Sequence, residues 1–127
     1  MLTDHRMHAT LPTADLERAR AFWGDLLGFS VYREVEGGAI MFESHGSRFA
    51  LFLTPNEVRG GHTQSGFEVD DIRAEVAWLT GKGVVFESYD YPMLQTDPSG
   101  IAKTAAGMSA WFKDPDNNLI GIVQFEK

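Results

Sequence analysis

The chain of 127 residues contains an internal repeat. The segment His8–Leu16 matches Gln64–Ile72 at a constant separation of 56 positions, and Gly28-Phe29 later matches Gly83-Val84 after a slip of one position. A repeat constrains the fold strongly, because each copy has to form the same structural unit. We therefore predict one domain built of two modules, near residues 5–57 and 62–127, with Arg59-Gly60-Gly61 as the linker.

Each module opens with a strand and continues with an amphipathic helix. Leu11 and Thr13 alternate onto one face of the first strand. The helix that follows carries an apolar stripe at helical spacing, which we expect to be buried: Leu16, Ala19, Trp23, Leu26 and Leu27. We predict Trp78 as a core residue of the second helix. Asp15 and either Asp70 or Asp71 are suited to start the helices, and Gly28 and Gly83 to end them.

Three strands are predicted after each helix. In the first module they span Phe29–Arg33, Ala39–Glu43 and Phe49–Leu53, and in the second Val84–Ser88, Met108–Lys113 and Leu119–Phe125. The stretch 89–107 is irregular and longer than an ordinary connection, which is typical of a binding loop. The pattern predicts an α+β fold in which two βαβββ modules form a curved sheet cup around a small molecule.

Composition excludes several classes of function. The absence of cysteine excludes disulfides, a thiolate nucleophile and any Cys-ligated metal site. A formal charge of −7 disfavours nucleic acid and anionic lipid as partners, and no apolar run approaches the length of a membrane span. With no signal-peptide pattern at the N-terminus, we expect a cytoplasmic protein. The motifs of serine hydrolases, phosphate loops and dinucleotide-binding folds do not occur in the sequence.

The sequence resembles the vicinal oxygen chelate superfamily, which contains glyoxalase I, extradiol dioxygenases, fosfomycin-resistance enzymes and bleomycin-resistance proteins. The resemblance rests on His8, the run Asp15–Trp23 with Leu27-Gly28-Phe29, the segment Phe67–Asp71, and Phe112-Lys113-Asp114-Pro115-Asp116-Asn117-Asn118-Leu119-Ile120. It covers nearly the whole chain in order. It implies the two-module cup, a small-molecule ligand and a homodimer. Because the superfamily holds both enzymes and inert binders, it does not by itself assign chemistry.

The resemblance also implies four metal-ligand positions, one near the start of each module and one in the last strand of each. The first two fall on His8 and Gln64. The third falls on Ala50 or Phe52, which share one strand face, and the fourth on Gly121. Alanine, phenylalanine and glycine offer no ligand atom, whereas a divalent cation needs carboxylates or several imidazoles. We therefore expect neither a metal nor another cofactor. A register slip that uses His8, His62 and one carboxylate remains an alternative.

Aromatic residues are expected where the metal chemistry is missing. With Phe112 under the helices, alternation turns Trp111, Ser109 and Lys113 towards the cup. With Phe29 and Val31 in the core, it turns Ser30 and Tyr32 the same way. Tyr89, Tyr91 and Met93 border the irregular stretch and can serve as adaptable contacts or loop anchors. The predicted ligand-binding residues are His8, Tyr32, Phe52, Gln64, Tyr91, Met93 and Trp111.

These features favour a metal-free binding protein over a catalyst. It would sequester an aromatic or extended organic compound or antibiotic. The negative net charge of the protein favours a neutral or cationic compound. One alternative is a metal-dependent lyase, isomerase or dioxygenase with an unusual ligand set. Another is a module that contacts a protein through a filled cup.

Overall fold

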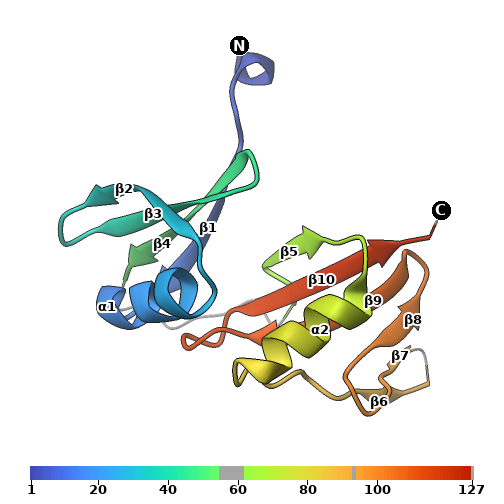
Figure 1. The fold of residues 1–127 in the computed structure, drawn as a ribbon. Helices are drawn as coiled ribbons and strands as arrows, with labels where there is room; N and C mark the ends of the chain where they lie inside the picture. Colours follow the sequence, from blue (N-terminus) through green and yellow to red (C-terminus); the bar gives the residue numbers. More distant parts are fainter. Residues whose placement is uncertain (55–61, 93, 127) are drawn as a thin grey trace. The chain divides into compact units, whose positions relative to one another are not determined.

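The computed structural model describes residues 1–54, 62–92 and 94–126, so the predicted linker 59–61 and Met93 lie outside the described residues. The chain divides into two compact units, residues Met1–Val58 and Arg59–Lys127, each with a four-stranded sheet and a helical segment (Figure 1). This is the α+β arrangement predicted from the repeat. In the described part of the chain, no helix has both the length and the apolar character needed to cross a bilayer.

The first unit follows the predicted strand–helix–three-strand order. A short 3-10 turn, η1 (Leu2–Asp4), precedes β1 (Ala9–Thr13), α1 (Leu16–Ala19), the π-helical stretch η2 (Arg20–Leu26), β2 (Ser30–Val35), β3 (Ala39–Ser44) and β4 (Ser47–Leu53). The strand order is β1-β4-β3-β2, with β1 parallel to β4 and the other pairs antiparallel. As predicted, Asp15 caps the helix by accepting a hydrogen bond from the Arg18 backbone N–H at 3.1 Å.

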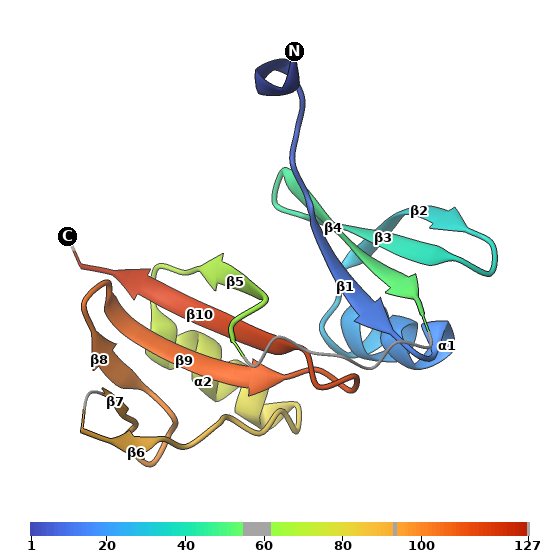
Figure 2. The same ribbon diagram turned by 180° about the vertical axis from the view of Figure 1, so that it is seen from behind.

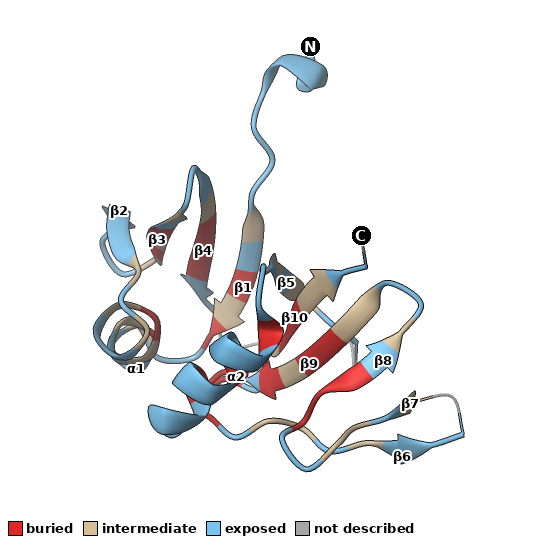
Figure 3. Ribbon diagram, turned by 45° about the vertical axis from the view of Figure 1, so that its right-hand side comes forward, coloured by how far each residue is buried: buried red, intermediate tan, exposed pale blue. Residues whose placement is uncertain are grey.

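The core of the first unit is aromatic. Trp23 is 1% exposed, and its ring lies 5.1 Å from the Phe49 ring and 5.9 Å from the Phe29 ring. The central strands are buried where they meet the helix (Figure 3). Two predicted core residues are instead exposed. Val31 lies on the edge strand β2, and Leu26 lies in the π-helical stretch, whose wider turns rotate it off the apolar stripe.

The second unit repeats the topology of the first. It contains β5 (Ser65–Glu68), α2 (Ile72–Gly81), β6 (Asp90–Tyr91), β7 (Leu94–Gln95), β8 (Ala102–Thr104), β9 (Gly107–Lys113) and β10 (Leu119–Phe125). The main sheet has the order β5-β10-β9-β8, with β5 parallel to β10 (Figure 2). The predicted strand Val84–Ser88 is wrong, because only a single bridge joins Phe86 to Phe112. In the main sheet, the first strand after α2 is β8, which lies within the stretch expected to be irregular.

Helix α2 corrects the prediction for Trp78. Its buried stripe consists of Ile72, Val76 and Leu79, and Asp71 caps its start by accepting from the Ala74 backbone N–H at 3.2 Å. Trp78 is about 200° around the helix from Val76 at 100° per residue, so it faces away from the sheet. It is 49% exposed, with the Lys82 ammonium 4.6 Å from the centre of its ring. The repeat pairs Trp23 with Leu79, and both of these are buried.

The turn between β9 and β10 is held by a buried carboxylate. One Asp114 oxygen accepts from the backbone N–H groups of Asp116 and Asn118, each at 2.9 Å, and the other accepts from the Asn118 amide at 2.8 Å. Asn117 takes the left-handed conformation (φ 65°) expected for this turn. Burial raises the pKa of Asp114, and the hydrogen bonds from Asn118 and Asp116 partly oppose that rise.

Candidate functional site

In the second unit, Gln64 lies just before β5 and is bound to the β9–β10 connection. Its side-chain amide donates to Asn118 Oδ1 at 2.9 Å, and its Oε1 accepts from the Leu119 backbone N–H at 3.1 Å. Its own backbone N–H donates to the Leu119 carbonyl at 2.8 Å. Both ends of the amide are therefore engaged within the chain. A ligand that used Gln64 would have to share these groups or displace Asn118 and Leu119 from them.

Gly121 and Trp111 lie opposite each other on β10 and β9, on the sheet face away from α2. A Cβ atom at Gly121 would lie 3.6 Å from both Cδ1 and Nε1 of the Trp111 indole, and 3.1 Å from the Thr63 methyl. The indole edge thus lies directly beside the position where the family resemblance places a metal-binding carboxylate. A side chain at 121 would require the Thr63 methyl to move by a few tenths of an ångström, whereas its Cβ would make ordinary van der Waals contact with the indole.

A row of aromatic rings extends from Trp111. The Tyr89 ring meets the Trp111 ring edge to face, with centroids 5.5 Å apart at 75°. Tyr91 stacks on Tyr89, with centroids 6.1 Å apart at 27°, and is 60% exposed. Burial raises the pKa of the Tyr89 phenol, and the nearby Glu87 charge adds to that rise, so the hydroxyl stays protonated at neutral pH. Such a row offers an apolar aromatic surface with polar tips.

Polar groups border this row. A hollow of about 500 Å3 is lined by His62, Gln64, Glu87, Tyr89, Lys113, Asn117 and Leu119. The Lys113 ammonium lies 3.3 Å from the Glu87 carboxylate, and both side chains are partly exposed. Among the residues predicted to bind ligand, Gln64 lines this hollow and Trp111 adjoins it through Tyr89. The site of the second unit therefore combines aromatic rings with one ion pair.

The two sheets resolve which residue of the first unit is equivalent to Gly121. In the second unit Gly121 pairs with Gly66, two residues after Gln64. In the first unit the residue two after His8 is Thr10, which pairs with Ala50. Ala50, 5% exposed, is therefore the counterpart of Gly121, and Phe52 lies one pair further along the same face. His8 itself lies just before β1 and is exposed.

Tyr32 and Phe52 both lie on the side of the first sheet opposite the helix. A bulge between Val31 and Arg33 sets Tyr32 against Arg48, whose guanidinium carbon is 3.6 Å from the centre of the tyrosine ring. Arg48 alternates with the core residue Phe49 and so faces away from the helix, as does Phe52, which is 38% exposed. The sequence analysis did not predict a role for Arg48. Because neighbouring strand residues face opposite sides, the core position of Phe49 could have predicted that Arg48 faces away from the helix.

The residues present do not fit the family's metal. In the last strands of the two units, the ligand positions are Ala50 and Gly121, which have no donor atom. Gln64 already bonds to Asn118 and Leu119. Within the described ranges, no three His, Asp or Glu side chains gather closely enough to hold an ion. What remains is at most two neutral groups, whereas divalent cations in proteins are held by carboxylates or several imidazoles.

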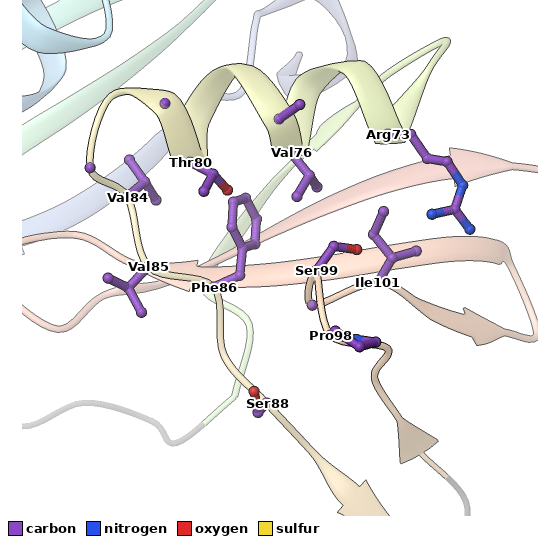
Figure 4. A pocket seen from close by; sticks show the side chains of 14 residues that line it. Arg73, Val76, Thr80, Val84, Val85, Phe86, Ser88, Pro98, Ser99 and Ile101 are labelled. Carbon is purple, nitrogen blue, oxygen red and sulfur yellow. The ribbon is translucent and has the colours of Figure 1, made fainter.

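A second hollow lies on the opposite, helix-covered side of the second sheet. It measures about 780 Å3 and runs between α2 and the segments 83–88 and 98–101. Figure 4 shows Phe86 on its floor and Arg73 at one end. The Arg73 guanidinium lies 3.6 Å from the Asp97 carboxylate. Of the predicted ligand-binding residues that the structure describes, none lines this hollow.

Comparison with known proteins identifies the family. A model of the Glyoxalase/Bleomycin resistance protein/Dioxygenase superfamily matches residues 6–122. TnmS3, an antibiotic binding protein from Streptomyces sp. CB03234, is 25% identical, with a TM-score of 0.63 over 96% of each chain.

Two further solved structures match along most of their length. A glyoxalase/bleomycin resistance protein from Streptomyces sp. CB03234 is 26% identical, with a TM-score of 0.63 over 92% of this chain and 97% of that one. A glyoxalase family protein from Enterococcus faecalis, 19% identical, has a TM-score of 0.71 over 96% of this chain and 98% of that one, a likeness of fold. No curated protein sequence matches. The predicted resemblance is confirmed, and the chain belongs to the Glyoxalase/Bleomycin resistance protein/Dioxygenase superfamily.

Proposed function

We propose that the protein binds and sequesters an aromatic or extended organic compound without making or breaking a bond. The observation that carries this proposal is the indole of Trp111, which lies beside Gly121 where the family resemblance places a metal-binding carboxylate. Ala50 at the equivalent position of the first unit gives independent support. TnmS3, described as an antibiotic binding protein, shares 25% of its residues with this chain, which is consistent with such a role.

The proposed binding chemistry is stacking. The residues we propose as ligand contacts are His8, Tyr32 and Phe52 in the first unit and Gln64, Tyr91, Met93 and Trp111 in the second, where Tyr89 joins them because its ring contacts both Tyr91 and Trp111. Each ring pair contributes about 0.5–1.5 kcal/mol beyond the burial of apolar area. The net charge of −7 favours the approach of neutral or cationic compounds.

The test is binding of phenylnaphthylamine, a neutral aromatic compound whose fluorescence rises in apolar surroundings. Trp111→Ala should weaken this binding about tenfold, because a stacking ring and its apolar area are lost. The mutant should lose only about 1–2 kcal/mol of stability, since Trp111 is half-buried and contacts one other ring.

Trp78→Ala is the matched control, because Trp78 lies on the solvent side of α2. It should leave the dissociation constant unchanged. Equal binding by the wild type and Trp111→Ala would contradict the role of Trp111. No binding of the probe by the wild type would contradict stacking as the basis of the function.

A metal-dependent enzyme is the second candidate, favoured by the retention of His8 at the family's first ligand position. It predicts one divalent ion per chain in protein purified without chelator, and loss of activity when that ion is removed. Metal analysis together with melting curves in Ni²⁺, Zn²⁺, Mn²⁺ and Fe²⁺ separates the two proposals, because a bound ion raises the stability of the folded state.

We further propose a homodimer. Strand β2 forms an open edge of the first sheet, and all six of its residues are exposed, including Val31 and Val35. An open edge strand with exposed valines is a surface on which chains can associate. Sedimentation equilibrium should give twice the chain mass of 14.1 kDa. A single species at the chain mass would refute the dimer and leave the binding proposal standing.

A further inference from the structure

Arg48 lies on the face of the first sheet that carries Ala50 and Phe52. Strand β4 alternates, with Phe49 and Leu51 directed into the core and Arg48, Ala50 and Phe52 directed away from the helix. Its guanidinium carbon is 3.6 Å from the centre of the Tyr32 ring. Stacking of this kind fixes the plane of the guanidinium and leaves its N–H edge available to a partner in that plane.

Arg48 also has a buried donor without an acceptor. Its Nε is shielded from solvent and has no hydrogen-bond partner in the described part of the chain. Two other arginines differ in this respect, since Arg20 pairs with Glu34 and Arg73 with Asp97. Glu43 is opposite Arg48 in the sheet, yet the described residues give no ion pair between them. A desolvated donor left without an acceptor is costly, and a ligand oxygen that displaces the atoms covering Nε and accepts from it removes that cost.

We propose that Arg48, positioned by Tyr32, binds an anionic oxygen group of the ligand. The guanidinium presents its donors in a fork that matches a carboxylate or another oxyanion. The ligand class is then an aromatic or extended organic compound that carries an acidic group. This inference rests on the proposed binding function and specifies its ligand further.

The acidic character of the whole chain does not oppose this assignment. Net charge acts at long range and is screened over about 8–10 Å at physiological salt. Arg48 acts at contact distance, within a layer that already excludes water from its Nε. A compound with one acidic group on a neutral or cationic framework satisfies both conditions.

The test compares two probes that share one ring system. Anilinonaphthalene sulfonate carries an oxyanion, and phenylnaphthylamine lacks it. Arg48→Met should weaken binding of the sulfonate about tenfold or more, which is the loss expected for a charged hydrogen bond, and leave binding of the neutral probe unchanged. Arg48→Lys keeps the charge but loses the forked arrangement of donors, so its affinity for the sulfonate should lie between those of the wild type and Arg48→Met.

Arg33→Met is the matched control, because it removes the same charge from the same face of the sheet. Arg33 pairs with Met41, and Met41 pairs with Ala50, which shares the face of Arg48. It should leave both dissociation constants unchanged. Equal weakening by Arg33→Met and Arg48→Met would show a general charge effect and overturn the assignment.

Two further outcomes separate this inference from the proposed function. If the neutral probe binds and Arg48→Met leaves sulfonate binding unchanged, the inference fails and the binding function stands. If the wild type binds neither probe, both fail. The melting temperature of each variant shows whether weaker binding comes from a lost ligand contact or from a destabilised fold. Arg48→Lys is the substitution that best preserves packing.

Discussion

Gln64 provides a sharp test of whether the family's second ligand position has become a structural residue. Gln64→Ala removes the hydrogen bond to Asn118 Oδ1 (2.9 Å) and the one from the Leu119 N–H (3.1 Å). Asn118 is fully buried, so neither water nor a nearby side chain readily replaces the lost donor. A buried group that loses its partner costs about 1–3 kcal/mol, and we expect a total loss of about 2–4 kcal/mol for the two bonds.

The assay is urea denaturation followed by circular dichroism at neutral pH. The transition midpoint should fall while the slope of the unfolding free energy with urea stays unchanged, because the substitution alters stability and leaves the exposed area alone. Gln95→Ala is the control, since within the described residues the Gln95 amide bonds only to the exposed Asp90 carboxylate, at 3.3 Å. Such surface changes stay within about 0.5 kcal/mol.

Gln64→Glu adds a pH-dependent form of the same test. The introduced carboxylate still accepts from the Leu119 N–H but has no proton to donate to Asn118 Oδ1. The pKa of the introduced carboxyl group should therefore be raised in the folded state. Its protonated form stabilises the fold below the unfolded pKa of about 4.3, and that contribution is lost as pH rises through the folded pKa. A loss below about 0.5 kcal/mol in Gln64→Ala would refute the structural role and leave the amide available to a ligand.

Trp23→Ala should cost about 3–5 kcal/mol in the same assay, because a fully buried ring with several aromatic neighbours is deleted; a small loss would refute its place in the core. Asp114, whose pKa is raised by burial, should titrate above 3.8 when its carboxyl carbon is followed by NMR, and its stabilising contribution should be lost as pH rises through that midpoint. Asp97 should behave in the opposite way, since the Ser99 hydroxyl lowers its pKa, so its contribution is present above 3.8 and lost as pH falls through the folded value.

Local patterns predicted the elements well where the side chains decide the structure. Asp15 and Asp71 cap their helices, and Gly28 and Gly83 take left-handed conformations after them, because these are requirements of the backbone itself. The repeat also predicted that both units share one topology. The prediction failed for Trp78, since the buried stripe of α2 runs through Ile72, Val76 and Leu79, and Trp78 lies about 200° around the helix from Val76.

The candidate site shows a similar division. Residue types alone revealed that Gly121 cannot bind a metal, but only the sheet register identified Ala50 as its counterpart in the first unit. Two contacts join residues that are far apart in sequence. Gln64 donates a hydrogen bond to Asn118, and Arg48 stacks on Tyr32, which lies at a bulge of β2.

The sequence by itself therefore determined the repeated unit and the helix ends, because both depend on residue type and short-range periodicity. The tertiary structure decided that β8 is the edge strand of the second sheet and that the Trp111 indole lies beside Gly121. It also decided which polar side chains, such as Gln64, already have hydrogen-bond partners within the chain. These depend on strand pairing and side-chain packing between distant segments, and several alternative registers satisfy the same local pattern.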